Sequence, residues 1–139
     1  MRPFSSRDEG KDWFIKILRN KGFKVVDTDY YRRTFPWDIE AEKDGKICLF
    51  ELKNRDFPST KYGDVTIEES KVRRMLVTPF RCFLVYFFED RWTLIDLRET
   101  PYSTIVKKHP KTTRFQDDDT ITTTWARWDI NNIRMLHYR

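Results

Sequence analysis

The stretch FPWDIEAEKDGKICLFELK, residues 35 to 53, decides how this chain folds. Asp44-Gly45 is the dipeptide most typical of a two-residue turn between antiparallel strands. The turn pairs Lys43 with Lys46, and this register gives one strand face a coherent apolar set: Ile39, Ala41, Cys48, Phe50 and Leu52. A slip of one residue would exchange the two faces and bury charged side chains, so the pattern itself predicts this register.

Two carboxylates and one ammonium group share the other face of this predicted hairpin. Asp38 falls directly opposite Glu51, with Cβ atoms about 5 Å apart, and Lys53 follows on the same face. Two like charges this close are unfavourable unless a cation compensates them, and a hard divalent ion is the natural partner of carboxylate oxygens. We therefore expect Mg²⁺, with Mn²⁺ as a substitute. Lys53 is placed to orient or deprotonate a water, or to stabilise charge developing on phosphorus.

A helix and a short strand are predicted before the hairpin. Ser6 and Glu9 have the spacing of a capping box, and the apolar residues that follow recur with helical period. The helix is expected over about residues 7 to 21, where Gly22 ends it. Residues 23 to 26 then form a strand.

A second helix and a further pair of strands are predicted after the hairpin. Thr66 and Glu69 have the spacing of another capping box, and Pro79 cannot continue the helix that it opens. Residues 81 to 88 and 92 to 97 form a strand-turn-strand unit. The expected order is α-β-β-β-α-β-β, followed by a C-terminal hairpin or edge strand.

Composition indicates a single globular domain with a basic surface. The chain has 139 residues, of which 39% are hydrophobic and 16% aromatic, enough for one core. Lys and Arg number 27 against 22 Asp and Glu, a balance that suits a polyanionic partner such as nucleic acid. Cys48 and Cys82 lie in apolar runs and are expected to be core thiols in a reducing compartment. No apolar run approaches the ~20 residues of a membrane span, so we expect a cytoplasmic protein with no membrane contact.

The pattern Pro36-Trp37-Asp38, followed by Glu51-Leu52-Lys53, resembles the PD-(D/E)xK nuclease superfamily, which includes restriction endonucleases and Holliday junction resolvases. Trp37 departs from the motif because it separates the proline from the aspartate. The flanking helices also resemble the α-β-β-β-α-β core of that superfamily, over about residues 5 to 97. Residues 62 to 71 are similar to the segment after the ExK strand in small phage-type nucleases.

The resemblance implies a magnesium site and completes its set of ligands. Asp38, Glu51 and the backbone carbonyl of Leu52 would bind the metal, and Lys53 would complete catalysis. Many relatives add an acidic residue from the first helix. Glu9 matches that position as a catalytic and metal-binding candidate, although the capping box explains a glutamate there without any metal.

A basic residue near the start of the second helix is also common in the superfamily. Lys71 is the candidate for this catalytic position. It lies on the apolar side of its helix, so it either snorkels at an edge or points into the site.

Basic and aromatic side chains elsewhere are candidates for nucleic-acid contacts. The candidate phosphate-binding residues are Arg73, Arg74, Lys107, Lys108 and Lys111, although basic runs are commonly just solvated surface. Trp125 and Trp128 either stack on unpaired bases or pack a sheet, and core packing is the better interpretation for at least one of them.

The resulting expectation is an α/β restriction-endonuclease-like fold with a central mixed sheet, flanked by helices, and a C-terminal strand or hairpin extension. Residues 1–139 form a single nuclease-like domain, with a core over about 5–97 and the extension over about 98–139. The expected activity is Mg²⁺-dependent hydrolysis of phosphodiester bonds, as an endonuclease, with DNA favoured by the resemblance and a homodimer left open. A virus-encoded protein acting in its host cell fits this picture. The alternative is a catalytically inactive nucleic-acid-binding or viral assembly protein with the same fold.

Overall fold

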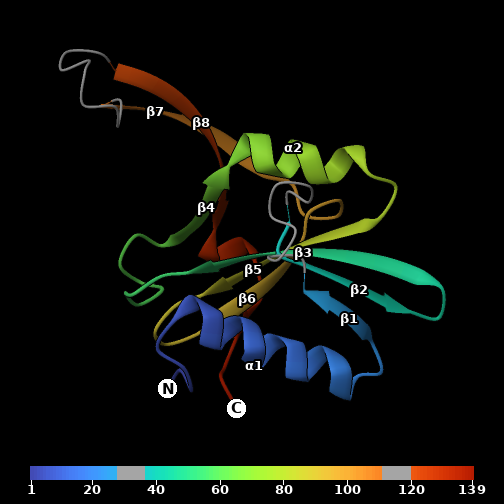
Figure 1. Cartoon of the computed structure of the whole chain (residues 1–139). Helices are drawn as coiled ribbons and strands as arrows, with labels where there is room; N and C mark the ends of the chain where they lie inside the picture. Colours follow the sequence, from blue (N-terminus) through green and yellow to red (C-terminus); the bar gives the residue numbers. More distant parts are fainter. Residues whose placement is uncertain (28–36, 111–119) are drawn as a thin grey trace.

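The computed structural model describes residues 1–27, 37–110 and 120–139 (Figure 1). Within these residues the helices and strands follow one another along the chain, with one short 3₁₀ turn, η2, near the end. In order they are α1 (Arg7–Asn20), β1 (Lys24–Asp27), β2 (Ile39–Lys43), β3 (Lys46–Asn54), β4 (Asp64–Glu68), α2 (Glu69–Val77), β5 (Arg81–Phe87), β6 (Trp92–Asp96), β7 (Ser103–Pro110), β8 (Thr120–Asp129), η2 (Ile130–Asn132) and β9 (Met135–Leu136).

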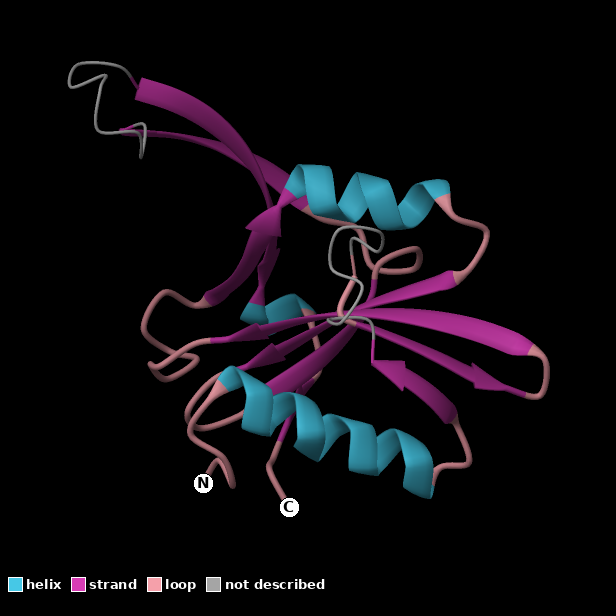
Figure 2. Ribbon diagram, viewed as in Figure 1, coloured by secondary structure: helices cyan, strands magenta, loops and turns pink. Residues whose placement is uncertain are grey.

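The strands form two sheets of different size. Over the described residues the larger sheet has six strands in the order β1-β2-β3-β5-β6-β9, and the smaller has three in the order β4-β8-β7. β3 and β5 run parallel while the other neighbours are antiparallel, so the larger sheet is mixed. Figure 2 shows α1 against one face of this sheet, and α2 with the smaller sheet over the other. The expected α/β fold with a central mixed sheet between helices is confirmed.

The predicted hairpin register is confirmed residue by residue. Lys43 pairs with Lys46 and Ile39 with Phe50. Both turn residues have positive φ, 53° at Asp44 and 75° at Gly45, which is the backbone that this tight turn requires. Asp-Gly tolerates that conformation at little cost, and the turn therefore sets the register of the strands that carry the site.

Each face of the larger sheet has its own apolar core. On the α1 side, Phe14 and Leu18 pack among the residues predicted for that face: Ile39, Ala41, Cys48, Phe50 and Leu52. On the α2 side, the core joins Val72 and Met75 of the helix to residues of both sheets: Leu49, Val65, Ile67, Leu84, Ala126 and Trp128. Burying a large apolar side chain stabilises by about 1.5–3 kcal/mol, so the two cores hold the helices against the sheet.

The predicted start of the second helix is wrong. Thr66 does not cap α2 but lies inside β4, and the helix begins at Glu69 after Glu68, whose side chain makes no capping hydrogen bond. Val65 and Ile67 alternate with Thr66 as a half-buried strand requires, and Thr66 pairs with Arg127 of β8. The β-branched threonine suits that strand, so pairing with a distant segment overrides the local capping pattern.

The expected C-terminal hairpin is confirmed and has a wider role than predicted. β7 and β8 pair from Ser103 with Arg127 to Pro110 with Thr120. β8 also pairs with β4, so the hairpin builds a second sheet instead of extending the edge of the first. In Figure 1 its far end projects beyond α2 at the upper left. No helix in the described ranges is long and apolar enough to cross a membrane.

Candidate active site

The hairpin brings the two predicted carboxylates together in a buried setting. Asp38 lies just before β2, where its N–H donates to the carbonyl oxygen of Phe50 at 3.0 Å. Its Oδ2 accepts a hydrogen bond from the N–H of Leu52 at 2.8 Å. Asp38 is 9% exposed and Glu51, in the middle of β3, is 4% exposed. Acidic side chains are rarely this buried without a strong compensating interaction, so the pair is a candidate functional site.

Two lysines approach Glu51 from different elements. Lys71, in the first turn of α2, places its Nζ 3.2 Å from Glu51 Oε2. Lys53, two residues along β3, places its Nζ 4.0 Å from the same oxygen. Of the two alternatives for Lys71, the structure therefore shows the one in which it points toward the carboxylate. The predicted residues Asp38, Glu51, Lys53 and Lys71 lie together.

The surroundings shift the pKa values of Glu51, Lys53 and Lys71 in different directions. Burial, and then the negative charge of Asp38, raise the pKa of Glu51 to about 7, although Lys71 and Lys53 oppose the rise. Burial, and then the positive charge of Lys71, lower the pKa of Lys53. Burial also acts to lower the pKa of Lys71, but the charge and hydrogen bonds of its neighbours, Glu51 foremost, raise it overall. The two lysines therefore differ in pKa. Lys53, whose pKa is lowered, gives up its proton more readily than Lys71, whose pKa is raised.

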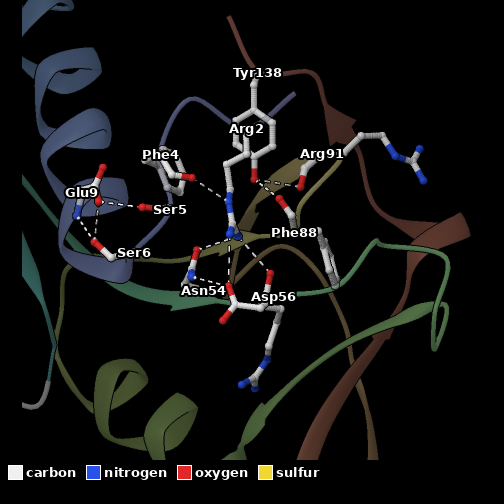
Figure 3. Close-up of polar contacts among 11 residues, drawn as sticks. Arg2, Phe4, Ser5, Ser6, Glu9, Asn54, Asp56, Phe88, Arg91 and Tyr138 are labelled. Atoms are coloured by element: carbon white, nitrogen blue, oxygen red, sulfur yellow. Dashed lines mark hydrogen bonds and ion pairs between the residues drawn. The ribbon is translucent and has the colours of Figure 1, made fainter.

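Glu9 does not join the carboxylate pair through its hydrogen bonds. Figure 3 shows it at the start of α1 with Ser5 and Ser6, whose hydroxyls donate to its Oε1 at 2.9 and 3.2 Å. Its own N–H donates to Ser6 Oγ at 3.2 Å, which is the bond that Ser6 makes as the N-cap in the predicted capping box. In residues 1–27, 37–110 and 120–139 there is no cluster of three or more His, Cys, Asp or Glu suited to a metal. The capping alternative accounts for Glu9 here.

Arg7 contacts the site where an acidic residue was expected. Its Nη2 donates to Asp38 Oδ1. Lys11, one turn further along α1, is 3% exposed and lies on the same side of the helix. Sequence reasoning missed both residues, although their spacing from the buried Phe14 places them on the sheet-facing side of α1. α1 therefore contributes positive charge, with Arg7 directly neutralising Asp38.

The remaining candidates lie outside this cluster. Arg73 forms an ion pair with Glu69 at 3.2 Å, while Arg74, Lys107 and Lys108 are exposed. The two candidate tryptophans, Trp125 and Trp128, both lie in β8. Trp128 is buried and donates to Thr100 O at 3.3 Å, confirming core packing for one of them. Pro36 and Lys111 lie outside the described residues.

Among the described residues, the candidate metal ligands are the carboxylates of Asp38 and Glu51, together with the carbonyl oxygen of Leu52, which follows Glu51 in β3. This donor set suits Mg²⁺, which binds through one or two carboxylates and keeps several waters. A bound cation would also favour the charged form of Glu51, which burial and the charge of Asp38 disfavour. The residues present therefore fit a hard divalent ion.

Fold and strand order define the class: the chain is an α/β protein of the restriction-endonuclease-like fold, which bears out the resemblance to the PD-(D/E)xK superfamily at the level of fold. A particular protein with this fold is Hjc, a Holliday junction resolvase from Archaeoglobus fulgidus. Its structure matches with a TM-score of 0.58 at 12% identity, over 93% of this chain and 88% of that one.

Curated relatives share more sequence over a shorter stretch. A UPF0102 protein of Persephonella marina is 30% identical over 70 residues, half of this chain. A UPF0102 protein of Syntrophomonas wolfei is 33% identical over 54 residues. The chain spans only 60% and 45% of the lengths of these two relatives. No family model matches the chain. These relatives are bacterial, and the expectation of a phage origin finds no support among them.

Proposed function

We propose that this chain is a metal-dependent nuclease that hydrolyses DNA phosphodiester bonds as an endonuclease, with Mg²⁺ or, in its place, Mn²⁺. The observation that carries the proposal is the buried pair Asp38 and Glu51 with two lysines beside it. In the proposed site, Asp38, Glu51 and the carbonyl oxygen of Leu52 hold the ion. When bound, it would supply Lewis acidity at the phosphoryl group.

The side chains around the pair have separate tasks in this proposal. Lys53, whose pKa is lowered, accepts a proton from the attacking water or donates to the phosphoryl oxygens as charge develops. Lys71 holds the Glu51 carboxylate in place through its 3.2 Å contact. In the metal-free protein Arg7 pairs with Asp38 from the opposite side, and a bound ion would displace it from this carboxylate. The Lys71 contact orients Glu51 before the substrate arrives, which is how positioning lowers a barrier.

DNA is proposed as the substrate for two reasons. The Archaeoglobus fulgidus protein of the same fold is described as a Holliday junction resolvase, and the chain has a formal net charge of +5. Arg73, Arg74, Lys107, Lys108 and Lys111 remain the proposed phosphate-binding residues. If the chain acts on junctions, it does so as a homodimer, because two strands must then be cut across a two-fold arrangement.

The test is cleavage of labelled linear, closed circular, single-stranded and four-way DNAs with Mg²⁺ or Mn²⁺. The wild type is compared with Asp38→Ala and Lys53→Ala, and Glu42→Gln on the exposed end of β2 is the matched control. We expect Lys53→Ala to lose about 100-fold or more, since a positioned general acid or base contributes about 10²–10⁴. Asp38→Ala should lose activity as well, because it removes one of the two carboxylates proposed to hold the ion. Cutting of the closed circle identifies an endonuclease.

Metal binding is measured separately, by titrating the protein with Mn²⁺ and following its electron paramagnetic resonance signal. Asp38→Ala should lose most of this binding, whereas Glu42→Gln should keep it. A wild type that binds DNA but neither binds Mn²⁺ nor cuts any of the four DNAs would instead favour the inactive binding protein with this fold. Equal cutting by the wild type and both site variants would reject the site.

A further inference from the structure

A pocket lies near Lys53, where the end of β3 meets the smaller sheet. Its volume is about 320 Å³, at the lower end of the roughly 300–1,000 Å³ that small-molecule sites occupy. Its lining mixes aromatic, basic, acidic and hydroxyl groups, among them Arg55, Tyr62, Asp64, Thr66, Tyr86 and Lys107. We refer to it as the β3–β4 pocket.

The β3–β4 pocket is continuous with the catalytic face of the sheet. Tyr86 of β5 pairs with Lys53 of β3, so the two side chains are neighbours on one face. Arg55 donates from Nε to the Tyr86 hydroxyl at 2.7 Å. Arg55 follows Lys53 by two residues, which is about 6.6 Å along an extended strand. A DNA strand with a phosphate at Lys53 would therefore reach the pocket within one or two nucleotides.

The outer wall of the pocket carries an exposed aromatic ring. Tyr62 is 64% exposed, and its ring meets Phe57 edge-on with centroids 5.2 Å apart. Lys61 Nζ lies 5.3 Å from the centroid of Phe57 and 5.4 Å from that of Tyr62. An exposed ring next to a cation is the combination on which unpaired bases stack in proteins that bind single strands.

The lining of the pocket carries charged groups of both signs. Asp64 Oδ2 accepts from Arg127 Nε at 2.8 Å, and a carboxylate in the lining can also accept the N–H groups of a base edge. Arg55 and Lys107 provide positive charge at the pocket for the phosphates on either side of that base. Lys107 is itself positioned over the ring of Trp125, at 5.8 Å from its centroid.

We propose that the β3–β4 pocket binds one unpaired nucleobase of the strand that is cut, so that the enzyme prefers DNA with an unpaired nucleotide beside the scissile phosphate. The inference rests on the proposed nuclease function and adds its substrate class. Tyr62 stacks on the base, and Asp64 accepts hydrogen bonds from its edge. Fully paired duplex lacks an occupant for the pocket.

The test uses three labelled DNAs of one sequence: a perfect duplex, the duplex with a one-nucleotide bulge, and the duplex with an abasic site as the bulge. Binding is measured by fluorescence anisotropy in EDTA, and cleavage is measured with Mg²⁺. The wild type should bind and cut the base-containing bulge about tenfold better than the other two, as expected for one stacked base. Tyr62→Ala should remove this preference while leaving duplex binding within about twofold.

Tyr62→Phe is the matched control, because it keeps the ring and should keep the preference. Circular dichroism spectra of both variants should match the spectrum of the wild type, because Tyr62 is exposed. Equal binding of the three DNAs by the wild type, or a preference that survives Tyr62→Ala, overturns the pocket's role. In either case, duplex cutting that is lost in Asp38→Ala still supports the nuclease. If no DNA is cut and no Mn²⁺ is bound, the proposed function fails, and the substrate class fails with it.

Discussion

Replacing Glu51 with glutamine should stabilise the metal-free protein, and increasingly so as the pH rises. In the folded chain, burial and the nearby charge of Asp38 raise the pKa of Glu51 from 4.5 to about 7. The unfolded chain therefore loses the Glu51 proton at a lower pH than the folded chain does. Between these two pKa values the folded state binds more protons, so this group lowers the free energy of unfolding as the pH rises. The loss is complete about one pH unit above the folded-state pKa of about 7.

The size of the effect follows from the same two pKa values. At about 1.36 kcal/mol per pKa unit, the rise from 4.5 to about 7 corresponds to about 3 kcal/mol. Because part of the change has already occurred at pH 5, about 2.5 kcal/mol is expected to develop between about pH 5 and about pH 8. Glutamine carries no ionisable proton, so Glu51→Gln lacks this dependence. The carboxylate that binding a metal requires is thus a destabilising group in the metal-free fold.

Urea denaturation in EDTA at the two pH values measures the difference in free energy of unfolding between Glu51→Gln and the wild type. The difference should move in favour of the variant by about 2–3 kcal/mol at the higher pH. Glu42→Gln, on the exposed end of the neighbouring strand, is the matched control. A difference for Glu51→Gln that stays the same at both pH values would refute the argument from burial and charge.

Three further predictions address other parts of the molecule. Arg7→Gln should raise the affinity for Mn²⁺ about fivefold in a calorimetric titration, because Arg7 then no longer competes with the ion for Asp38. The Arg7–Asp38 ion pair is partly exposed and worth up to about 1 kcal/mol. A weaker or unaltered affinity would contradict this prediction. Gly10→Ala should lower the free energy of unfolding by about 1–3 kcal/mol, since its Cβ would lie 2.7 Å from the Phe4 ring; a variant as stable as the wild type would exclude that contact. Lys108→Gln should reduce the slope of log K for DNA against log salt by about one, and an unchanged slope would remove it from the phosphate-binding residues.

The sequence by itself determined the hairpin and the pair of carboxylates that it carries. An Asp-Gly turn and an alternation of period two are local signals, and each is sufficient to set which residues face each other. The pairing of Lys43 with Lys46 followed from them, and so did the positions of Asp38, Glu51 and Lys53. The helix boundaries of α1 followed for the same reason, since Ser6 caps it and Gly22 follows its end.

Only the tertiary structure decided which distant residues complete the site and what lies around it. Thr66 has a convincing local capping pattern, yet it pairs with Arg127, 61 positions further along the chain. Arg7 reaches Asp38 from a helix on the other side of the sheet, and the approach of α2 brings Lys71 to Glu51. These contacts depend on how whole elements pack, and packing energy is shared among many side chains, so no short stretch of sequence encodes the outcome.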